Sequence, residues 1–409
     1  MLSVAEAETI ILNLATPFDA EQDIKTIPLS EATGRILAAP IVGKLDFPYW
    51  DNSAMDGYAV RYADVKDCSP QQTVTLEVVA EISAGREPTV EIKAGQTARI
   101  FTGAMLPPGA DTIVIQENTI RRNNRVEILN APQPQEFVRH QGAFYRAGTP
   151  MLEPGVTIGA ADIAVLATAQ CTDLSVYRRP RVAILSTGDE LITPDRPLKP
   201  GQIVDSNQYA LASFVESNGG IPVSLGIVPD RPAALKQAIA EAIESADMVL
   251  STGGVSVGDY DYVDRILAEL GGELHIRSVA VKPGKPLTVA KFPNSCLYFG
   301  IPGNPVSALV SCWRFVRPAL LKLSGLTENY RPTFIKARCR DRLSSGGTRE
   351  TYLWGKLLAI DEEYEFSLAG GSHSSGNLIN LAQTNALAVI PVGQKSIAPD
   401  EVVRVMRLD

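Results

Sequence analysis

Residues 248–261 read MVLSTGGVSVGDYD, and this stretch decides the fold class. The apolar run MVL passes directly into five small residues, 251–255, and two aspartates follow at positions 259 and 261. A short, continuous apolar run is typical of a strand buried on both faces. Glycine and serine after such a strand allow a ligand to approach the backbone closely. The stretch therefore predicts a buried strand that ends at a binding loop.

The sequence around this stretch alternates between strand and helix patterns. Helical spacing of apolar residues occurs near 209–217, 233–246, 262–270 and 305–323. Between these segments lie the strand patterns VAIL, PVSLGIV, MVL and LYFG. Such alternation predicts a parallel sheet covered on both faces. We expect residues 177–325 to form this α/β domain.

The rest of the chain predicts three further parts. Residues 46–144 contain short alternating runs broken by Gly and Pro, which indicates a compact β-rich domain. Residues 1–45 and 145–176 are expected to form an adapter, with helices at 1–15, at 30–38 behind an N-cap at Ser30, and at 159–169. Residues 326–409 form a β-rich tail.

Composition excludes several classes of protein. The net charge of -8 gives no basic face for nucleic acid. No apolar stretch is long enough to cross a membrane, and the N-terminus lacks a basic leader, so a cytoplasmic location is expected. The cysteines lack CxxC spacing, which favours reduced and mostly buried thiols. They are Cys68, Cys171, Cys296, Cys312 and Cys339.

Three strand ends of the predicted sheet carry small residues. Carboxyl ends of parallel strands meet at one edge, where ligands of such sheets bind. Glycines, hydroxyls and free backbone N–H groups there suit a phosphate-like anion, although any one such loop could be an ordinary tight turn. The candidate substrate-binding residues are Ser186, Thr187, Gly188, Gly253, Gly254, Ser256, Pro302, Gly303, Asn304 and Pro305.

Acidic and basic side chains accompany these loops. Carboxylates beside a phosphate site are expected to share a Mg²⁺ ion with it. Two lysines, Lys282 and Lys285, flank a Pro-Gly turn and are candidate anion ligands. Solvated turn and cap acids, and an ordinary surface lysine pair, remain the simpler alternatives. The acids are Asp189, Glu190, Asp205, Asp230, Asp259 and Asp261.

A second polar cluster falls in the β-rich domain. The stretch FPYWDNSAMDGYAV contains Asp56 between aromatic residues, and RIFTGAMLPPGAD places Thr102 after a strand. An Asx-rich turn is the structural alternative. The chain contains no HExxH or GxxxxGK[ST] motif and no GxGxxG after a first strand, which disfavours zinc hydrolases, P-loop enzymes and dinucleotide oxidoreductases.

The motifs DNSAMDGYAV, RIFTGAMLPPGAD, VIQE, LSTGDEL, STGGVSVGDYDY, VKPGKP, GIPGNPVSA and GSHSSGNL occur in this order along nearly the whole chain. Together they resemble the molybdopterin molybdenumtransferase family, which includes the E domain of gephyrin. The resemblance implies a four-part subunit whose tail is a β barrel. It also implies a homodimer whose cleft joins the α/β domain of one subunit to the β-rich domain of the other.

The implied reaction takes adenylylated molybdopterin and molybdate, uses Mg²⁺ to cleave the phosphoanhydride, and releases AMP with molybdenum on the dithiolene. A molybdopterin adenylyltransferase and a molybdoenzyme are possible partners. Motif matching adds Thr102, Asp230 and Ser372 as substrate contacts, with Pro302 and Pro305 shaping a loop. The expected catalytic residues are Asp56, Glu190, Asp261, Lys282 and Lys285, of which the three acids are also candidate metal ligands.

One position departs from the family pattern. The motif RxxGxD appears here as Arg139 to Phe144, with an aromatic residue in place of the acid. That departure could weaken Mg²⁺ or molybdate handling, or shift the role to Glu117. A noncatalytic carrier of molybdopterin on the same fold therefore stays open beside the enzyme. An adenylyltransferase is disfavoured, because that activity usually belongs to a separate small α/β protein.

Overall fold

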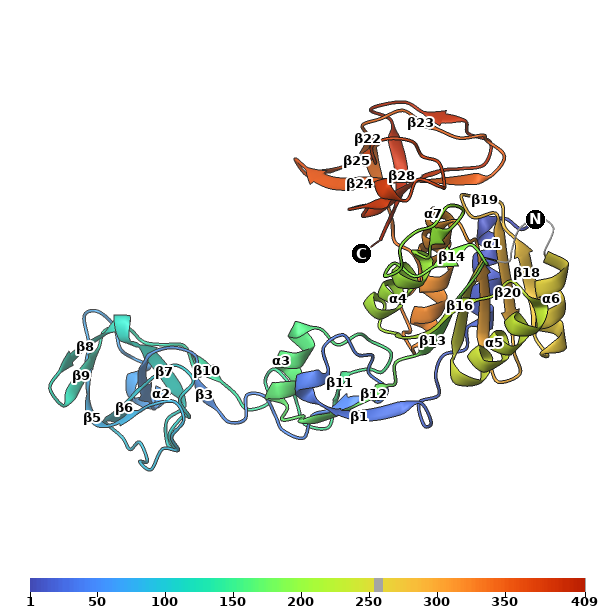
Figure 1. Cartoon of the computed structure of the whole chain (residues 1–409). Helices are drawn as coiled ribbons and strands as arrows, with labels where there is room; N and C mark the ends of the chain where they lie inside the picture. Colours follow the sequence, from blue (N-terminus) through green and yellow to red (C-terminus); the bar gives the residue numbers. More distant parts are fainter. Residues whose placement is uncertain (254–259, 409) are drawn as a thin grey trace. The chain divides into compact units, whose positions relative to one another are not determined.

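The computed structural model describes residues 1–253 and 260–408, with the backbone alone for 260–262. The chain forms two compact units (Figure 1). The first unit contains Met1–Ala39, Pro154–Ile163 and Asp173–Asp409, and the second contains Pro40–Glu153 and Ala164–Thr172. The four expected domain boundaries stay predictions.

A six-stranded sheet forms the centre of the first unit. Its order is β16-β13-β17-β21-β20-β18, and the neighbours from β16 to β21 pair in parallel. β20 runs antiparallel to both of its neighbours, so the expectation of a wholly parallel sheet was wrong at this edge. The chain reaches β20 by a tight turn at Gly284 and leaves by a hairpin, which needs no helical crossover. The strands are β13 (Arg181–Thr187), β16 (Ile221–Val228), β17 (Met248–Thr252), β18 (Glu273–Ser278), β20 (Pro286–Lys291) and β21 (Leu297–Ile301).

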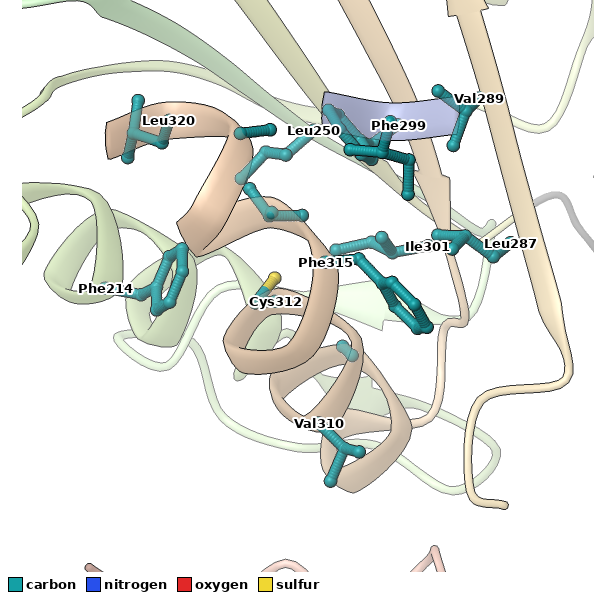
Figure 2. Packing of buried hydrophobic residues seen from close by; sticks show 14 of the residues in the cluster. Phe214, Leu250, Leu287, Val289, Phe299, Ile301, Val310, Cys312, Phe315 and Leu320 are labelled. Atoms are coloured by element: carbon teal, nitrogen blue, oxygen red, sulfur yellow. The ribbon is translucent and has the colours of Figure 1, made fainter. Parts of the chain in front are cut away.

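Helices cover both faces of this sheet. α5 and α6 contribute to one buried cluster, and α1, α4, α7 and α8 contribute to the other. This second cluster contains Phe214 of α4, Phe315 of the π-helical turn, and Leu250 and Phe299 of the sheet (Figure 2). The helices are α4 (Asn207–Ser217), α5 (Pro232–Ser245), α6 (Tyr260–Glu269), α7 (Pro305–Ser311), a π-helical turn (Cys312–Val316) and α8 (Arg317–Leu323).

The N-terminal segment begins as expected and then departs from the prediction. α1 (Val4–Leu14) starts at a capping box formed by Ser3 and Glu6. The helix expected at 30–38 was wrong. Only a single 3₁₀ turn (Leu29–Glu31) forms there, and Gly34, whose φ is 74°, interrupts any longer helix. Before it, β1 (Ile24–Pro28) pairs with β12 (Asp173–Tyr177), and α3 spans Ala160–Thr168.

The second unit is built on a sheet of order β7-β4-β6-β5-β9-β8. Its runs TVTLEVVAEI, TARIF and DTIVIQE form strands as expected, because their alternating apolar residues fill two buried clusters. The strands are β4 (Gly57–Val60), β5 (Val74–Ile82), β6 (Gln96–Ile100), β7 (Thr112–Ile115), β8 (Thr119–Arg122) and β9 (Arg125–Ile128). Shorter elements are β2 (Ile41–Val42), β3 (Asn52–Ser53), α2 (Tyr62–Val65), β10 (Val138–Arg139) and β11 (Pro150–Leu152).

The C-terminal region of the first unit closes into a five-stranded barrel, because β24 pairs with both β25 and β26. The short β19 (Val281–Lys282) pairs in parallel with the start of β24, so the lysine turn of the α/β domain meets the barrel directly. The barrel strands are β22 (Phe334–Cys339), β24 (Glu350–Ile360), β25 (Glu363–Leu368), β26 (Ala386–Ile390) and β28 (Val402–Arg407). Short pairs are β14 (Leu191–Ile192) with β15 (Ile203–Val204), and β23 (Leu343–Ser344) with β27 (Ser396–Ile397).

Among the described helices, none combines the length and the apolar character that crossing a bilayer requires.

Candidate functional site

The three predicted strand ends lie next to one another at the carboxyl edge of the sheet. β17 lies between β13 and β21, and Thr252 is level with both Ser186 and Ile301. The hydroxyl groups of Ser186 and Thr252 are buried and share a hydrogen bond of 3.1 Å. Thr187 donates to the carbonyl of Thr252 at 3.4 Å. These hydroxyls therefore hold the strand ends together and leave the loop backbone for a ligand.

The glycines of these loops permit unusually close packing. Gly253 has a φ of 85°, and a Cβ atom there would lie 2.2 Å from the carbonyl oxygen of Thr187. A Cβ on Gly303 would lie 3.4 Å from the Cα of Gly253. A Cβ on Gly188 would lie 2.6 Å from a carboxylate oxygen of Glu190. The loops after β13, β17 and β21 are thus in mutual contact. Gly254, Ser256 and Asp259 lie outside the described residues.

The loop from Pro302 to Pro305 is held by side chains from two directions. Asn207 of α4 donates its amide to the carbonyl of Gly303 at 2.7 Å. Asn304 donates to the hydroxyl of Ser375 at 3.4 Å, which connects the loop to the barrel region. Within the GSHSSGNL stretch, it is therefore Ser375 that contacts the loop. The Ser372 hydroxyl instead accepts from the N–H of Ser374, so its substrate role stays a prediction.

Three of the acids at this edge, Asp189, Glu190 and Asp230, are exposed. The backbone N–H of Asp230 donates to the carboxylate of Asp189 at 3.2 Å, and Glu190 is exposed. Asp205 is buried, with one oxygen that has no partner among the described residues. Asp261 belongs to α6, and its side chain lies outside the described residues. Within the described part of the chain, three His, Cys, Asp or Glu side chains never gather closely enough to hold a metal ion.

A cavity of about 530 Å³ lies beside the two lysines, between the α/β domain and the barrel. Lys282, Lys285 and Arg349 line it, and none of its described lining residues is an acid. Serine hydroxyls and the ring of His373 complete its polar wall. Three cations without a counter-ion in the lining suit a small oxyanion. The two lysines, 282 and 285, are therefore brought together as expected.

Sequence reasoning missed Arg349. It stands in the turn SSGGTRE directly before β24, and its guanidinium donates to the carbonyl of Val281 at 3.3 Å. That contact fixes the arginine beside the lysine turn. A basic residue at the start of a predicted strand was the available signal, but the pairing of β19 with β24 could not be read from the sequence.

His373 was also missed as a lining residue. Its Nε2 lies 2.8 Å from the carbonyl of Ala369, so this nitrogen carries the proton. Its Nδ1 is buried without a partner among the described residues, and its ring lies 4.7 Å from that of Trp354. The Oδ1 atom of Asn304 is likewise buried without a partner in the described part of the chain. Such unsatisfied polar atoms indicate a ligand or ordered water.

In the second unit, Asp56 and Thr102 are in direct contact. One carboxylate oxygen of Asp56 accepts the Thr102 hydroxyl at 2.7 Å and the Thr102 N–H at 2.8 Å. These hydrogen bonds hold the pKa of Asp56 below its ordinary value, with a smaller contribution from Arg99. Asp56 is therefore a preformed, solvent-facing anion.

Phe144 is 64% exposed and lies in an aromatic group of the second unit. Its ring centroid is 5.9 Å from that of Phe47, which in turn contacts Tyr49. The backbone N–H of Gln141, in the same turn, donates to Asp51 at 2.7 Å. The turn of the RxxGxD-like motif is thus held by an acid from the DNSAMDG stretch, although its own acid is replaced.

Three family models match consecutive parts of the chain. Residues 2–169 match the MoeA N-terminal region (domain I and II), residues 183–322 match a probable molybdopterin binding domain, and residues 336–408 match the MoeA C-terminal region (domain IV). A molybdopterin biosynthesis MoeA protein from Pyrococcus horikoshii has a TM-score of 0.85 at 27% identity, with 100% of both chains covered. The fold is therefore the multidomain α/β and β fold expected from the motifs.

The relatives identify the family. A molybdopterin molybdenumtransferase from Nostoc sp. is 58% identical over 410 residues, covering 100% of this chain and 94% of that protein. One from Haemophilus influenzae is 31% identical, covering 99% of this chain and 98% of the relative. The chain belongs to the molybdopterin molybdenumtransferase family, which confirms the resemblance.

Proposed function

We propose that this protein inserts molybdenum from molybdate into adenylylated molybdopterin and releases AMP. The observation that carries the proposal is the cavity lined by Lys282, Lys285 and Arg349, which has no acid among its described lining residues and adjoins the loop of residues 302–305. An oxyanion such as molybdate is a suitable occupant of a site with three cations. Membership of the family supports the same activity.

The two parts of the site have different tasks in this proposal. The backbone of residues 186–188, 253 and 302–305 binds the phosphate-bearing substrate at the carboxyl edge of the sheet. The cationic cavity holds the oxyanion and compensates its charge. Catalysis then depends on positioning and charge compensation, as in other phosphoryl chemistry, and no side chain has to act as a nucleophile. Ser372 and Asp230 keep their proposed substrate-contact roles.

Mg²⁺ is part of the proposal. The ion commonly takes only one or two protein carboxylates and completes its shell with phosphate and water oxygens. A separated, exposed carboxylate such as Glu190 fits that requirement, and Asp56 and Asp261 remain the other candidates. When bound, the ion would neutralise the phosphoanhydride charge. These side chains orient the phosphate groups and present anionic oxygens.

We further propose that the active form is a homodimer in the cytoplasm. Asp56 belongs to the second unit and the lysines to the first. Pairing of two chains would allow Asp56 of one to serve the lysine cavity of the other. The five cysteines are free thiols, which supports a reducing compartment. A molybdopterin adenylyltransferase and a molybdoenzyme would act before and after this protein.

AMP release from adenylylated molybdopterin, with molybdate and Mg²⁺ added, tests the proposal. We expect Lys285→Gln and Arg349→Gln each to raise the molybdate concentration for half-maximal rate at least tenfold, since each removes one charge-assisted contact of about 1.5 to 3 kcal/mol. Lys336→Gln is the matched control, because Lys336 is an exposed residue of the barrel outside the cavity.

The same assay separates the enzyme from a carrier, the alternative that Phe144 raises. Stoichiometric binding of the adenylylated ligand without AMP release would favour the carrier. Equal molybdate dependence in Lys285→Gln and Lys336→Gln would instead show that the cavity does not hold the oxyanion.

A further inference from the structure

A second cavity, which is rich in arginine, lies in the first unit at the opposite end of the sheet. Its volume is about 280 Å³, and four of its lining residues are Arg35, Arg178, Arg179 and Arg317. No acid occurs among the described residues that line it. It opens where the chain enters β13, and β13 spans seven residues before reaching the Ser186 loop. At about 3.3 Å per residue, this cavity lies roughly 20 Å from the carboxyl edge.

The four arginines differ in how their charge is balanced. The Arg178 guanidinium is paired with Asp23 and Asp247 at 2.7 Å and stacks 4.0 Å over the ring of Phe18. Both ion pairs raise the pKa of Arg178, and the pair with Asp247 has the larger effect. This arginine is therefore a structural member of the wall.

For Arg35 and Arg179, no carboxylate partner is found among the described residues. Arg35 is half-buried and donates to the carbonyl of Tyr177 at 2.8 Å, a neutral acceptor. Burial lowers the pKa of Arg35, and the positive charge of Arg179 lowers it further, against an opposing effect of Glu31. Two cations thus repel each other at the cavity, and an anion between them would relieve that repulsion.

The carbonyl groups at the surrounding helix ends have hydrogen-bond partners of their own. The cavity touches the C-terminus of α4, where carbonyls are negative in character. Those carbonyls are already bonded: Gly219 and Gly220 donate to Glu216 and Val215. At the end of α8, the Ser324 hydroxyl donates to Leu320. Arg317 donates to the side-chain oxygen of Asn218 at 2.9 Å.

We propose that this cavity, lined by Arg35, Arg179 and Arg317, binds a small phosphate-class oxyanion at a site separate from the substrate site. Guanidinium groups bind phosphate oxygens in pairs, and the space is just below the roughly 300 Å³ at which drug-sized pockets begin. The wall combines residues 34–36 and 177–180 with α4 and α8. A bound anion therefore links the segment before β13 to the α/β domain.

The test is calorimetric titration of the full-length chain with pyrophosphate. It uses the background Lys282→Gln/Lys285→Gln, which weakens the substrate cavity. We expect saturable binding in this background. Adding Arg35→Gln and Arg179→Gln should weaken that binding at least tenfold. The control is Arg122→Gln, an exposed residue of the second unit, which should leave it unchanged.

Two further arms identify the source of the phosphate and guard against misfolding. Equal affinity for inorganic phosphate and AMP would indicate recognition of the phosphate alone, and tighter binding of AMP would indicate a nucleotide. Arg179 is exposed, so Arg179→Glu should keep the unfolding temperature of the free protein yet abolish the binding. No binding in the lysine background, or unchanged binding in both Arg179 variants, would overturn the proposal and leave the arginines as helix-end partners only.

Discussion

At the scale of single residues, Gly253 links the sequence pattern to the packing of the site. A side chain at this position meets both a φ of 85° and the carbonyl oxygen of Thr187. Gly201 has the same φ of 85°, but a Cβ there would have no atom within 4 Å, so this residue separates the two effects.

We predict that Gly253→Ala lowers the free energy of unfolding more than Gly201→Ala. Both variants bear the cost of a left-handed conformation, about 1 to 2 kcal/mol. Only the first must also separate the ends of β13 and β17. AMP release should therefore fall at least tenfold in Gly253→Ala and stay unchanged in Gly201→Ala. Similar losses in both variants would show that conformation alone explains the glycine.

A second residue-scale prediction concerns Asp56. Thr102→Val removes one of the two hydrogen bonds to its carboxylate, so its pKa should rise toward the ordinary value near 4. A carboxyl group whose pKa is lowered in the folded state stabilises the fold at pH values above its unfolded-state pKa. This contribution disappears as the pH falls through the folded-state pKa.

The stability difference between wild type and Thr102→Val should accordingly be present at pH 7 and shrink below about pH 4. Carbon-detected NMR titration of the Asp56 carboxyl gives the pKa directly. Thr102→Ser keeps the hydroxyl and should restore the lowered value. An Asp56 pKa that is identical in all three proteins would exclude the hydroxyl as its cause.

At the scale of elements, α1 is joined to the helix of residues 305–323 and to the barrel by one buried arginine. Arg314 lies in the π-helical turn and is 4% exposed. It donates to Glu8 of α1 at 2.8 Å and to the hydroxyl of Tyr352 of β24 at 2.9 Å. π-helical turns occur frequently at functional sites of proteins.

Removing Glu8 should therefore destabilise the first unit strongly. We predict a loss of about 3 to 5 kcal/mol for Glu8→Ala, because it leaves a buried charge without its partner. Glu8→Gln keeps a hydrogen bond and should lose less. Urea unfolding followed by the fluorescence of Trp313 and Trp354 measures this, with exposed Glu216→Gln as control. Equal stability of Glu8→Ala and the control would contradict the role of the arginine.

The sequence predicts elements well where local pattern and packing agree. The helices of the α/β domain begin and end within a few residues of expectation, because their apolar faces match the sheet. Residues 30–38 looked helical by composition, yet the helix is interrupted at Gly34, and residues 36 and 37 form β-bridges with residues 157 and 176. Local propensity could not reveal those distant partners.

In the candidate site, too, residues in local motifs were predictable and residues that depend on distant partners were not. The strand-end loops and the lysine pair were predictable, because each belongs to a short local motif. Arg349 and Ser375 were not, since they reach the site only through the closure of the barrel against the lysine turn. The antiparallel β20 was missed for a similar reason: its hairpin partner β21 fixes its direction. Local sequence patterns cannot predict residues whose position depends on long-range strand pairing.

At the scale of the whole molecule, the proposal requires two chains to share each active site. At a molybdate concentration well below that for the half-maximal rate, Asp56→Asn and Lys285→Gln should each nearly abolish AMP release by a homodimer. Differently tagged chains allow heterodimers of known composition to be purified. In a shared-site dimer, an Asp56→Asn chain paired with a Lys285→Gln chain leaves one of two sites intact.

We predict about half of wild-type AMP release for that heterodimer. The matched control carries both substitutions on one chain, paired with a wild-type chain. Sharing then damages both sites, so this control should be inactive although it contains the same two substitutions. If each site instead lies within one chain, the outcomes reverse: the control keeps half of the activity and the first heterodimer has none. A chain that remains monomeric by light scattering while fully active would equally reject the shared site.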